Sequence, residues 1–256
     1  MDYNFHTHTF RCNHANGTER EYIERAIEGG IKTFGFSDHA PYAFEDGYES
    51  FFRVPMEQAE EYVSTLSALR EEYADRIDIR IGFEMEYYPQ HFDKMLQTVR
   101  SVGAEYLILG QHFIGNEHPG GHPSGSGTDD LAKLEDYVNC VIAGMRSGAF
   151  TYVAHPDMFL YTGDAADYER EMRRICVASR ETGIPLEINF LGLRDHRSYP
   201  NEAFWKIAGE ERSPVTFGHD AHRAIDAYDP DSICKAHSLV SKYGLAYIGK
   251  PKLRRP

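Results

Sequence analysis

The residues best suited to chemistry in this chain are its 13 histidines, many of which stand beside carboxylates where an apolar run ends. His6 and His8 form an HxH pair, and residues i and i+2 of a strand point to the same side, so both rings can reach one ion. Six further strand-end or loop positions carry candidate ligands or their partners: His14, Asp38-His39, Glu84, His112, His155 and Asp220-Ala221-His222. This set of imidazoles and carboxylates indicates a metal site.

Each of these histidines taken alone is more often a hydrogen-bonded loop residue than a metal ligand. Taken together they favour a site with several ions, because every buried donor or acceptor without a partner costs roughly 1–3 kcal/mol. Metal coordination satisfies many of them at once. The remaining histidines carry no such prediction: His91 and His237 fall in helical patterns, and His118 and His122 fall in a glycine-rich loop.

Short β-rich runs alternate with amphipathic stretches along the whole chain, which is typical of βα units and a parallel sheet. The strands are expected near residues 3–6, 33–37, 77–84, 105–111, 150–155, 184–190, 213–219 and 245–249. The helices are expected near 18–29, 55–74, 90–102, 129–147, 165–182, 201–211 and 230–243, with a loop over 114–128. Most candidate ligands then fall at the C-terminal ends of strands, the face on which α/β barrels build their sites.

Length and composition limit the class of protein. The 256 residues, 41% of them hydrophobic, suit one domain spanning 1–256. The formal charge of -13 argues against nucleic acid and anionic membranes as partners, so an anionic substrate would need local positive charge. No apolar run approaches the ~18 residues of a membrane span. The N-terminus has no targeting pattern, so we expect a cytoplasmic protein without membrane partners. The sequence does not indicate an oligomeric state.

The ordered set of motifs resembles the PHP family, named for polymerase and histidinol phosphatase domains. The motifs, in order, are HTH (6–8), His14, SDH (37–39), Glu84, His112, AHPD (154–157) and HDAH (219–222). The resemblance implies a distorted (β/α)7 TIM-like barrel that holds three divalent ions at the C-terminal ends of its strands. Zinc is the first choice, with iron or manganese as alternatives. In this chain Gln111 precedes the fourth-strand histidine where a small residue is expected, and His219 stands where a serine is usual.

The resemblance also implies a division of the ligands among the three ions. His6, His8, Glu84 and Asp220 would hold one ion, and Glu84 would bridge to a second ion held by His112 and His155. The third ion would be held by His14, His39 and His222.

The segment LEINFLGLRDHRSYP (186–200) and the chain length look most like the histidinol-phosphate phosphatases of the family. The implied reaction is hydrolysis of a small phosphate monoester, L-histidinol phosphate, by a water activated on the metals. Other phosphate esters (a nucleotide, a sugar phosphate or a phosphotyrosine) and a non-catalytic metal-binding module are the alternatives.

Several residues are candidates for the chemistry itself. Glu84 and Asp220 would act as catalytic ligands. The proton for the leaving group would come from a metal-bound water, Asp38 or Asp220, and Asp38 could instead orient a ligand imidazole. Four cationic or polar side chains are candidates for binding the phosphate, with Arg197 favoured: Arg197, Arg194, His196 and Arg11.

Overall fold

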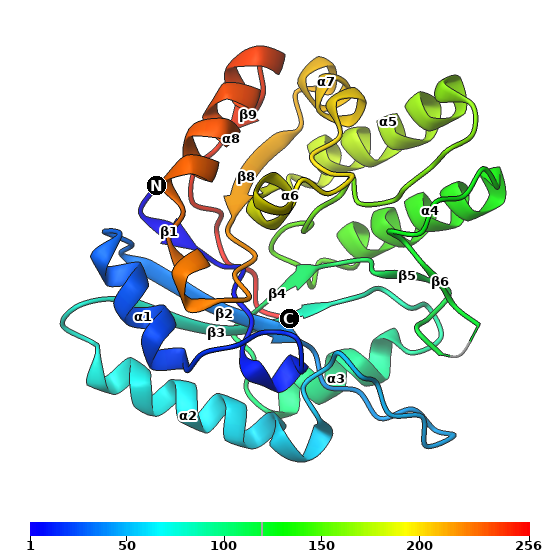
Figure 1. Ribbon diagram of the computed structural model, residues 1–256. Coiled ribbons are helices and arrows are strands. Elements are labelled where there is room, and N and C mark those ends of the chain that lie inside the picture. Colours follow the sequence, from blue (N-terminus) through cyan, green and yellow to red (C-terminus); the bar gives the residue numbers. More distant parts are fainter. Residues whose placement is uncertain (119) are drawn as a thin grey trace.

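The computed structural model describes residues 1–118 and 120–256, and parallel strands form its centre (Figure 1). Four strands follow one another in one sheet, in the order β1 (Tyr3–Asn4), β2 (Thr33–His39), β3 (Asp78–Met85) and β4 (Tyr106–Leu109). A second run consists of β7 (Leu186–Asn189), β8 (Pro214–Gly218) and β9 (Ala246–Tyr247). All neighbours in both runs pair in parallel, as the βα alternation predicted.

Isolated bridges join the two runs into a distorted barrel. Val153 pairs with Leu109, the last residue of β4, and with Leu186 of β7, and Thr7 pairs with Ala221 beyond β8. The predicted barrel is therefore confirmed, but the strand expected at 150–155 is reduced to the single bridge at Val153. The extended conformation stops there because His155 adopts a φ of 32°.

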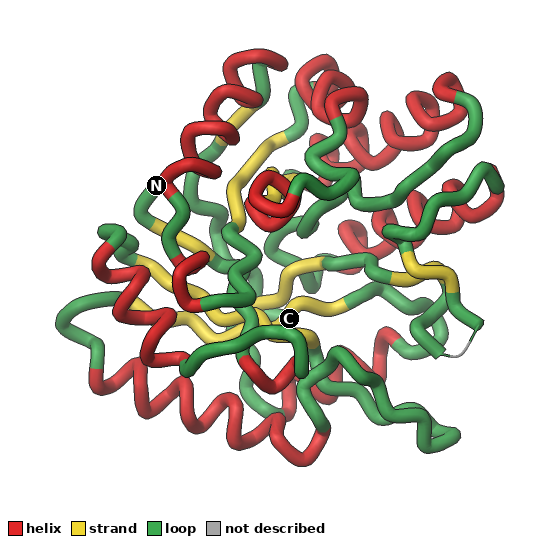
Figure 2. The backbone as a smooth tube through the Cα atoms, viewed as in Figure 1, coloured by secondary structure: helices red, strands yellow, loops and turns green. Residues whose placement is uncertain are grey.

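Helices surround the strands (Figure 2), and their bounds agree with the predicted segments to within a few residues. They are α1 (Glu19–Glu28), α2 (Ala59–Glu72), α3 (Phe92–Ser101), α4 (Leu131–Ser147), α5 (Ala165–Thr182), α7 (Glu202–Glu211) and α8 (Pro230–Tyr243). Two elements were not predicted: the helix α6 (Phe190–Asp195), and a hairpin of β5 (Phe113–Ile114) with β6 (His122–Pro123) inside the expected loop. Three 3-10 turns complete the described chain, at Phe10–Cys12, Met56–Gln58 and Ala224–Ala227.

Local signals in the sequence explain where several helices begin and end. The Thr18 side chain caps α1 by accepting from the Glu21 amide, while Glu21 accepts from the Thr18 amide at 2.7 Å. Gly148 ends α4 in the left-handed conformation at φ 77°. The unpredicted helix α6 begins because the side chain of Asn189, the last residue of β7, accepts from the Gly192 amide.

The interior of the barrel is filled by aromatic side chains around Tyr106. Its hydroxyl donates to the carbonyls of Phe5 and Phe36, both at 3.0 Å, and so ties three neighbouring parts of the barrel together. Room for the ring comes from glycine on the neighbouring strands: a Cβ on Gly35 would lie 2.3 Å from the Tyr106 hydroxyl oxygen, and one on Gly82 would lie 2.6 Å from the ring.

Gly82→Ala is therefore expected to destabilise the protein. Its new Cβ would also lie 2.5 Å from the Tyr106 carbonyl oxygen, which is backbone and cannot move aside easily. We expect a loss of about 2–3 kcal/mol in the free energy of unfolding, measured by urea denaturation. Gly125→Ala is the control, since a Cβ there meets nothing within 4 Å; equal stabilities of the two variants would contradict this account of the barrel interior.

Candidate metal centre

The barrel brings all nine predicted ligands into one cluster at the C-terminal ends of its strands. Eight of them line a cavity of about 540 Å³, and His6 lies buried beneath it. The nine residues are His6, His8, His14, His39, Glu84, His112, His155, Asp220 and His222.

Glu84, at the end of β3, is the centre of the cluster. Its Oε1 lies 2.9 Å from His155 Nε2 and 3.4 Å from His112 Nε2. Its Oε2 faces three more ring nitrogens, at 3.5, 3.5 and 3.4 Å, from His6, His8 and His39. One carboxylate thus contacts five imidazoles from four different segments of the chain.

Asp220 is the second carboxylate of the cluster and contacts three of its imidazoles. Its Oδ1 lies 3.2 Å from His8 Nε2, 3.5 Å from His6 Nε2 and 3.3 Å from His222 Nδ1. The ring of His14 completes the cluster, with its centroid 4.9 Å from that of His222 and 5.2 Å from that of His39.

The donor atoms fit divalent cations. Five sets of three described residues bring ligand atoms within 4.8 Å of one another, and four of them consist of predicted ligands: His8–His39–His222, His6–His155–Asp220, His6–His8–Glu84 and His39–Glu84–His112. The fifth is His8–Cys12–Asp38. Three buried atoms at their centre have no hydrogen-bond partner among the described residues: His6 Nε2, His39 Nδ1 and Asp220 Oδ1. Leaving such atoms unpaired is costly, and a coordinated cation would satisfy them together.

Two of the ligands stand on unusual backbone. His155 has a φ of 32° and Asp220 a φ of 47°, both in the left-handed region that non-glycine residues rarely adopt. Neighbouring groups hold these conformations: the His155 amide donates to Glu187 Oε2 at 3.1 Å, and Arg194 donates to the Asp220 carbonyl at 3.1 Å. Strain of this kind concentrates where side chains must be aimed at a site.

A second layer of carboxylates orients the imidazoles. Glu187 accepts from His6 Nδ1 at 2.9 Å and Glu86 from His112 Nδ1 at 2.6 Å, while Asp38 Oδ1 lies 3.4 Å from His8 Nδ1. In each case the other ring nitrogen is directed at the cluster. Carboxylate partners of this kind fix the tautomer and ring orientation of metal-bound histidines.

The sequence analysis missed Glu86 and Glu187. A signal for both existed, because Glu86 stands at i+2 from Glu84, and Glu187 is an acidic residue inside the apolar strand LEIN.

The electrostatics of the cluster keep its carboxylates ionised. Burial alone would raise the pKa of Glu84, but the surrounding imidazoles of His112 and His6 outweigh burial and hold that pKa well below its usual range. His6 and His222 do the same for the pKa of Asp220. Burial, reinforced by His8, lowers the pKa of His39 well below its usual value, so this ring is neutral and able to act as a ligand.

Of the four predicted phosphate-binding residues, Arg197 alone belongs to the described lining of the cavity. Arg11 is buried, and its Nε and Nη2 each donate a hydrogen bond of 2.9 Å to the carboxylate of Glu61. Arg194 donates to the carbonyls of His219 and Asp220, and so supports the ligand loop from behind. His196 ends α6 in a left-handed conformation.

Asp38 also stands behind the cavity. Its Oδ2 accepts from the Thr9 amide at 3.0 Å and its Oδ1 accepts from the His39 amide at 2.8 Å. The side chain is fully buried. These contacts correspond to the orienting alternative of the sequence analysis.

The walls of the cavity are largely apolar and were not predicted as site residues. They comprise Phe51, Phe52, Phe113, Met158, Leu191 and Tyr199. Asp195 and the ion pair of Arg223 with Asp226, whose Nε–Oδ2 distance is 2.7 Å, add charge at the rim.

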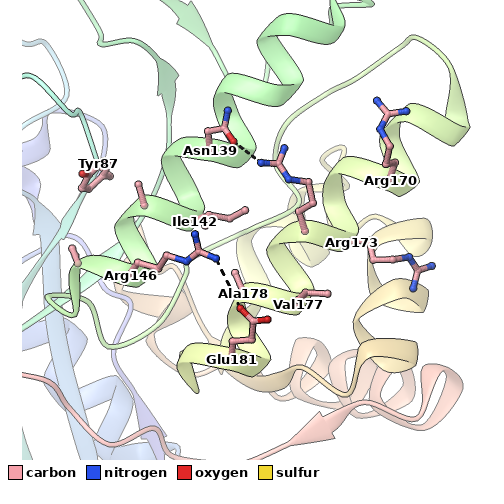
Figure 3. A pocket seen from close by; sticks show the side chains of 12 residues that line it. Tyr87, Asn139, Ile142, Arg146, Arg170, Arg173, Val177, Ala178 and Glu181 are labelled. Atoms are coloured by element: carbon pink, nitrogen blue, oxygen red, sulfur yellow. Dashed lines mark hydrogen bonds and ion pairs between the residues drawn. The ribbon is translucent and has the colours of Figure 1, made fainter.

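A larger cavity, of about 840 Å³, lies between α4 and α5 (Figure 3) and lacks this chemistry. Its lining contains arginines, but they are paired with acidic side chains. Arg173 donates to Glu210 at 2.7 Å, and Arg146 lies 3.9 Å from Glu181. None of the nine candidate ligands belongs to its described lining. The candidate metal centre therefore lies in the smaller cavity, which eight of them line.

Among the described helices, none combines the length and apolar character that crossing a bilayer requires.

Several known proteins are similar to this chain in sequence and in fold. Over residues 4–190 the chain matches the family model described as "PHP domain". It is 29% identical to a probable histidinol-phosphatase of Deinococcus radiodurans, with 85% of each chain covered. It is 28% identical to a histidinol-phosphatase of Bacillus subtilis, with 86% of this chain and 93% of the relative covered.

The similar solved structures include a histidinol phosphate phosphatase from Lactococcus lactis, complexed with zinc, L-histidinol and phosphate. It superposes with a TM-score of 0.74 at 21% identity, over 96% of this chain and 95% of the other. The family model covers most of the chain, and its range contains seven of the nine candidate ligands of the cluster, from His6 to His155. The chain therefore belongs to the PHP domain family.

Proposed function

We propose that this protein is a metal-dependent phosphomonoesterase that hydrolyses L-histidinol phosphate to L-histidinol and phosphate, with residues 1–256 as one catalytic domain. The observation that carries the proposal is the cluster of seven imidazoles around Glu84 and Asp220 in a cavity with apolar walls. The names of the two relatives and the ligands of the Lactococcus lactis structure support the choice of substrate.

The ligand set suits three divalent ions. We assign His6, His8, Glu84 and Asp220 to the first ion, Glu84, His112 and His155 to the second, and His14, His39 and His222 to the third. Zinc is the preferred metal because it accepts mixed nitrogen and oxygen ligands and is present in the Lactococcus lactis structure. Iron and manganese are the alternatives.

When bound, such ions polarise a phosphate ester and lower the pKa of water toward ~7. The residues of the chain prepare the site for that chemistry. Glu84 and Asp220 hold the ring nitrogens at fixed distances, and Asp38, through His8, acts as an orienting residue. The aromatic walls exclude water from the ester.

The rim of the cavity suits the two ends of this substrate. Arg197 can donate two parallel hydrogen bonds to phosphate. The ammonium and imidazole of L-histidinol phosphate need acidic and aromatic neighbours, which Asp195, Phe52 and Phe113 offer.

Arg197→Ala is expected to raise KM for L-histidinol phosphate by roughly 10- to 100-fold, because a charge-assisted contact to the phosphate is lost. Arg197→Lys should recover only part of this, since an ammonium cannot bind two oxygens in the planar manner of a guanidinium. His196→Ala is the matched control from the same turn, outside the described cavity lining, and should leave KM unchanged. Steady-state kinetics measure all three variants; equal KM values for Arg197→Ala and His196→Ala would remove Arg197 from the site.

The substrate assignment is tested by phosphate release from a panel of monoesters. The panel contains L-histidinol phosphate, a nucleotide, a sugar phosphate and a phosphotyrosine peptide, each assayed with metal-stripped and with metal-restored protein. We expect L-histidinol phosphate to have the highest kcat/KM by at least tenfold. Equal low rates on all four would contradict the assignment, and no release with any metal would favour a binding module.

A further inference from the structure

Arg53 lies at the centre of a buried ionic network that reaches the metal cluster from behind. Its Nη2 donates to Glu86 Oε2 at 2.5 Å, and Glu86 Oε1 accepts from His112 Nδ1 at 2.6 Å. On its other side, Arg53 Nε donates to both oxygens of Glu117, at 2.8 and 2.9 Å. The remaining Nη1 donates to the Ala40 carbonyl at 3.0 Å.

The charges of this network do not balance. The side chains of Arg53, Glu86 and Glu117 are 2%, 0% and 0% exposed, so two carboxylates share one guanidinium out of contact with water. A buried excess of one negative charge is unfavourable unless a positive charge lies nearby. His112 is the neighbour through which a cation can be reached, because its Nε2 points away from Glu86 toward Glu84.

We propose that Glu86 and Arg53 are positioning residues for the ion bound at His112, and that the excess negative charge of their network raises the affinity of that ion. This proposal rests on the proposed metal centre. The carboxylate of Glu86 fixes the His112 ring with Nε2 toward the cluster, and Arg53 fixes Glu86 in turn.

The same guanidinium also holds one wall of the substrate cavity. Its Cζ lies 5.0 Å from the ring centroid of Phe52, which stacks on Phe113 at 5.7 Å and 20°. Phe113 precedes the loop that carries Glu117, and both rings line the cavity. Arg53 therefore joins two functions: the Glu86 arm positions a metal ligand, and the Glu117 arm positions the aromatic wall.

The Glu86→Gln variant tests whether Glu86 positions the His112 ring or only fills space beside it. His112 and Arg53 contact different oxygens of Glu86, and in the amide one of these two atoms becomes an NH2 group that cannot accept a hydrogen bond. We expect Zn²⁺ at this position to bind 10- to 100-fold more weakly, the range expected when a partner of a ligating histidine is lost. Metal-stripped protein is titrated with Zn²⁺ against a chromophoric chelator. Glu86→Asp, which keeps both oxygens, should recover part of the affinity.

The control is Glu24→Gln, which removes a carboxylate that pairs with Arg76 at 2.8 Å on the exposed face of α1. It should bind Zn²⁺ as the parent does. Parent affinity in folded Glu86→Gln would overturn the proposal. The affinity for Zn²⁺ is measured without substrate. A parent protein that binds Zn²⁺ but does not hydrolyse L-histidinol phosphate would therefore contradict the proposed function and not this proposal.

Glu117→Gln tests the second arm and remains informative if Glu86→Gln does not fold. Zn²⁺ affinity should fall by less than it does in Glu86→Gln, because the excess negative charge of the network is lost but the contacts of Glu86 with Arg53 and His112 remain. KM should rise severalfold for whichever ester the parent hydrolyses fastest, because the aromatic wall loses its support. A loss of Zn²⁺ affinity as large as that of Glu86→Gln, without a change in KM, would overturn the division into two arms.

Discussion

Glu84→Gln is expected to lower kcat by a factor on the order of 10³ or more while the protein stays folded. The carboxylate contacts five ring nitrogens from four segments, and an amide cannot bind cations through both of its polar atoms. Each tenfold in rate corresponds to about 1.4 kcal/mol, so the expected effect is equivalent to about 4 kcal/mol of lost transition-state stabilisation. Steady-state kinetics with restored metal, together with circular dichroism, measure activity and fold.

Asp78→Asn is the matched control for this variant. Asp78 is the first residue of the same strand, at the opposite end of the barrel, where it forms an exposed pair with Arg80 at 3.0 Å. It should retain parent kcat, because exposed ion pairs contribute little. Activity of Glu84→Gln within about tenfold of this control would mean that Glu84 does not hold the ions.

Removal of the metals is expected to abolish turnover and to lower the melting temperature by about 10 °C. A ligand present at about 1,000 times its dissociation constant stabilises the folded state by about 4 kcal/mol, and in a chain of this size each kcal/mol corresponds to about 2–4 °C. Without the ions, His6 Nε2, His39 Nδ1 and Asp220 Oδ1 remain buried and have no partner among the described residues. Thermal melts and activity assays are recorded before chelation, after chelation and after Zn²⁺ is restored.

Two comparisons separate this effect from general damage by the chelator. Asp78→Asn should show the full shift in melting temperature, whereas Glu84→Gln should show a smaller one because it binds the ions less well. Restored Zn²⁺ should return both activity and melting temperature of the parent. Chelated protein that elemental analysis shows to be free of metal, but that is still fully active, would contradict the metal-dependent mechanism.

The sequence alone predicted the barrel class and the histidines and carboxylates that the structure gathers into one cluster. This was possible because both depend on local rules: apolar periodicity predicts strands and helices, and parallel strands collect their C-terminal residues on one face. His6 and His8 needed only their i, i+2 spacing, and Glu84 needed only its place at the end of a strand. The strand at 150–155 was overestimated because periodicity does not reveal that His155 leaves the extended conformation.

Only the tertiary structure decided which charged side chains are free to act and which are already paired. Arg11 and Arg197 were both phosphate-binding candidates in the sequence, but Glu61 of α2 and Glu19 of α1 neutralise the first, while the second lines the cavity. Glu86 and Arg53 are 33 positions apart and meet only in the folded barrel. An arginine or carboxylate acquires its role from partners brought together by long-range packing, and no local pattern along the chain encodes that pairing.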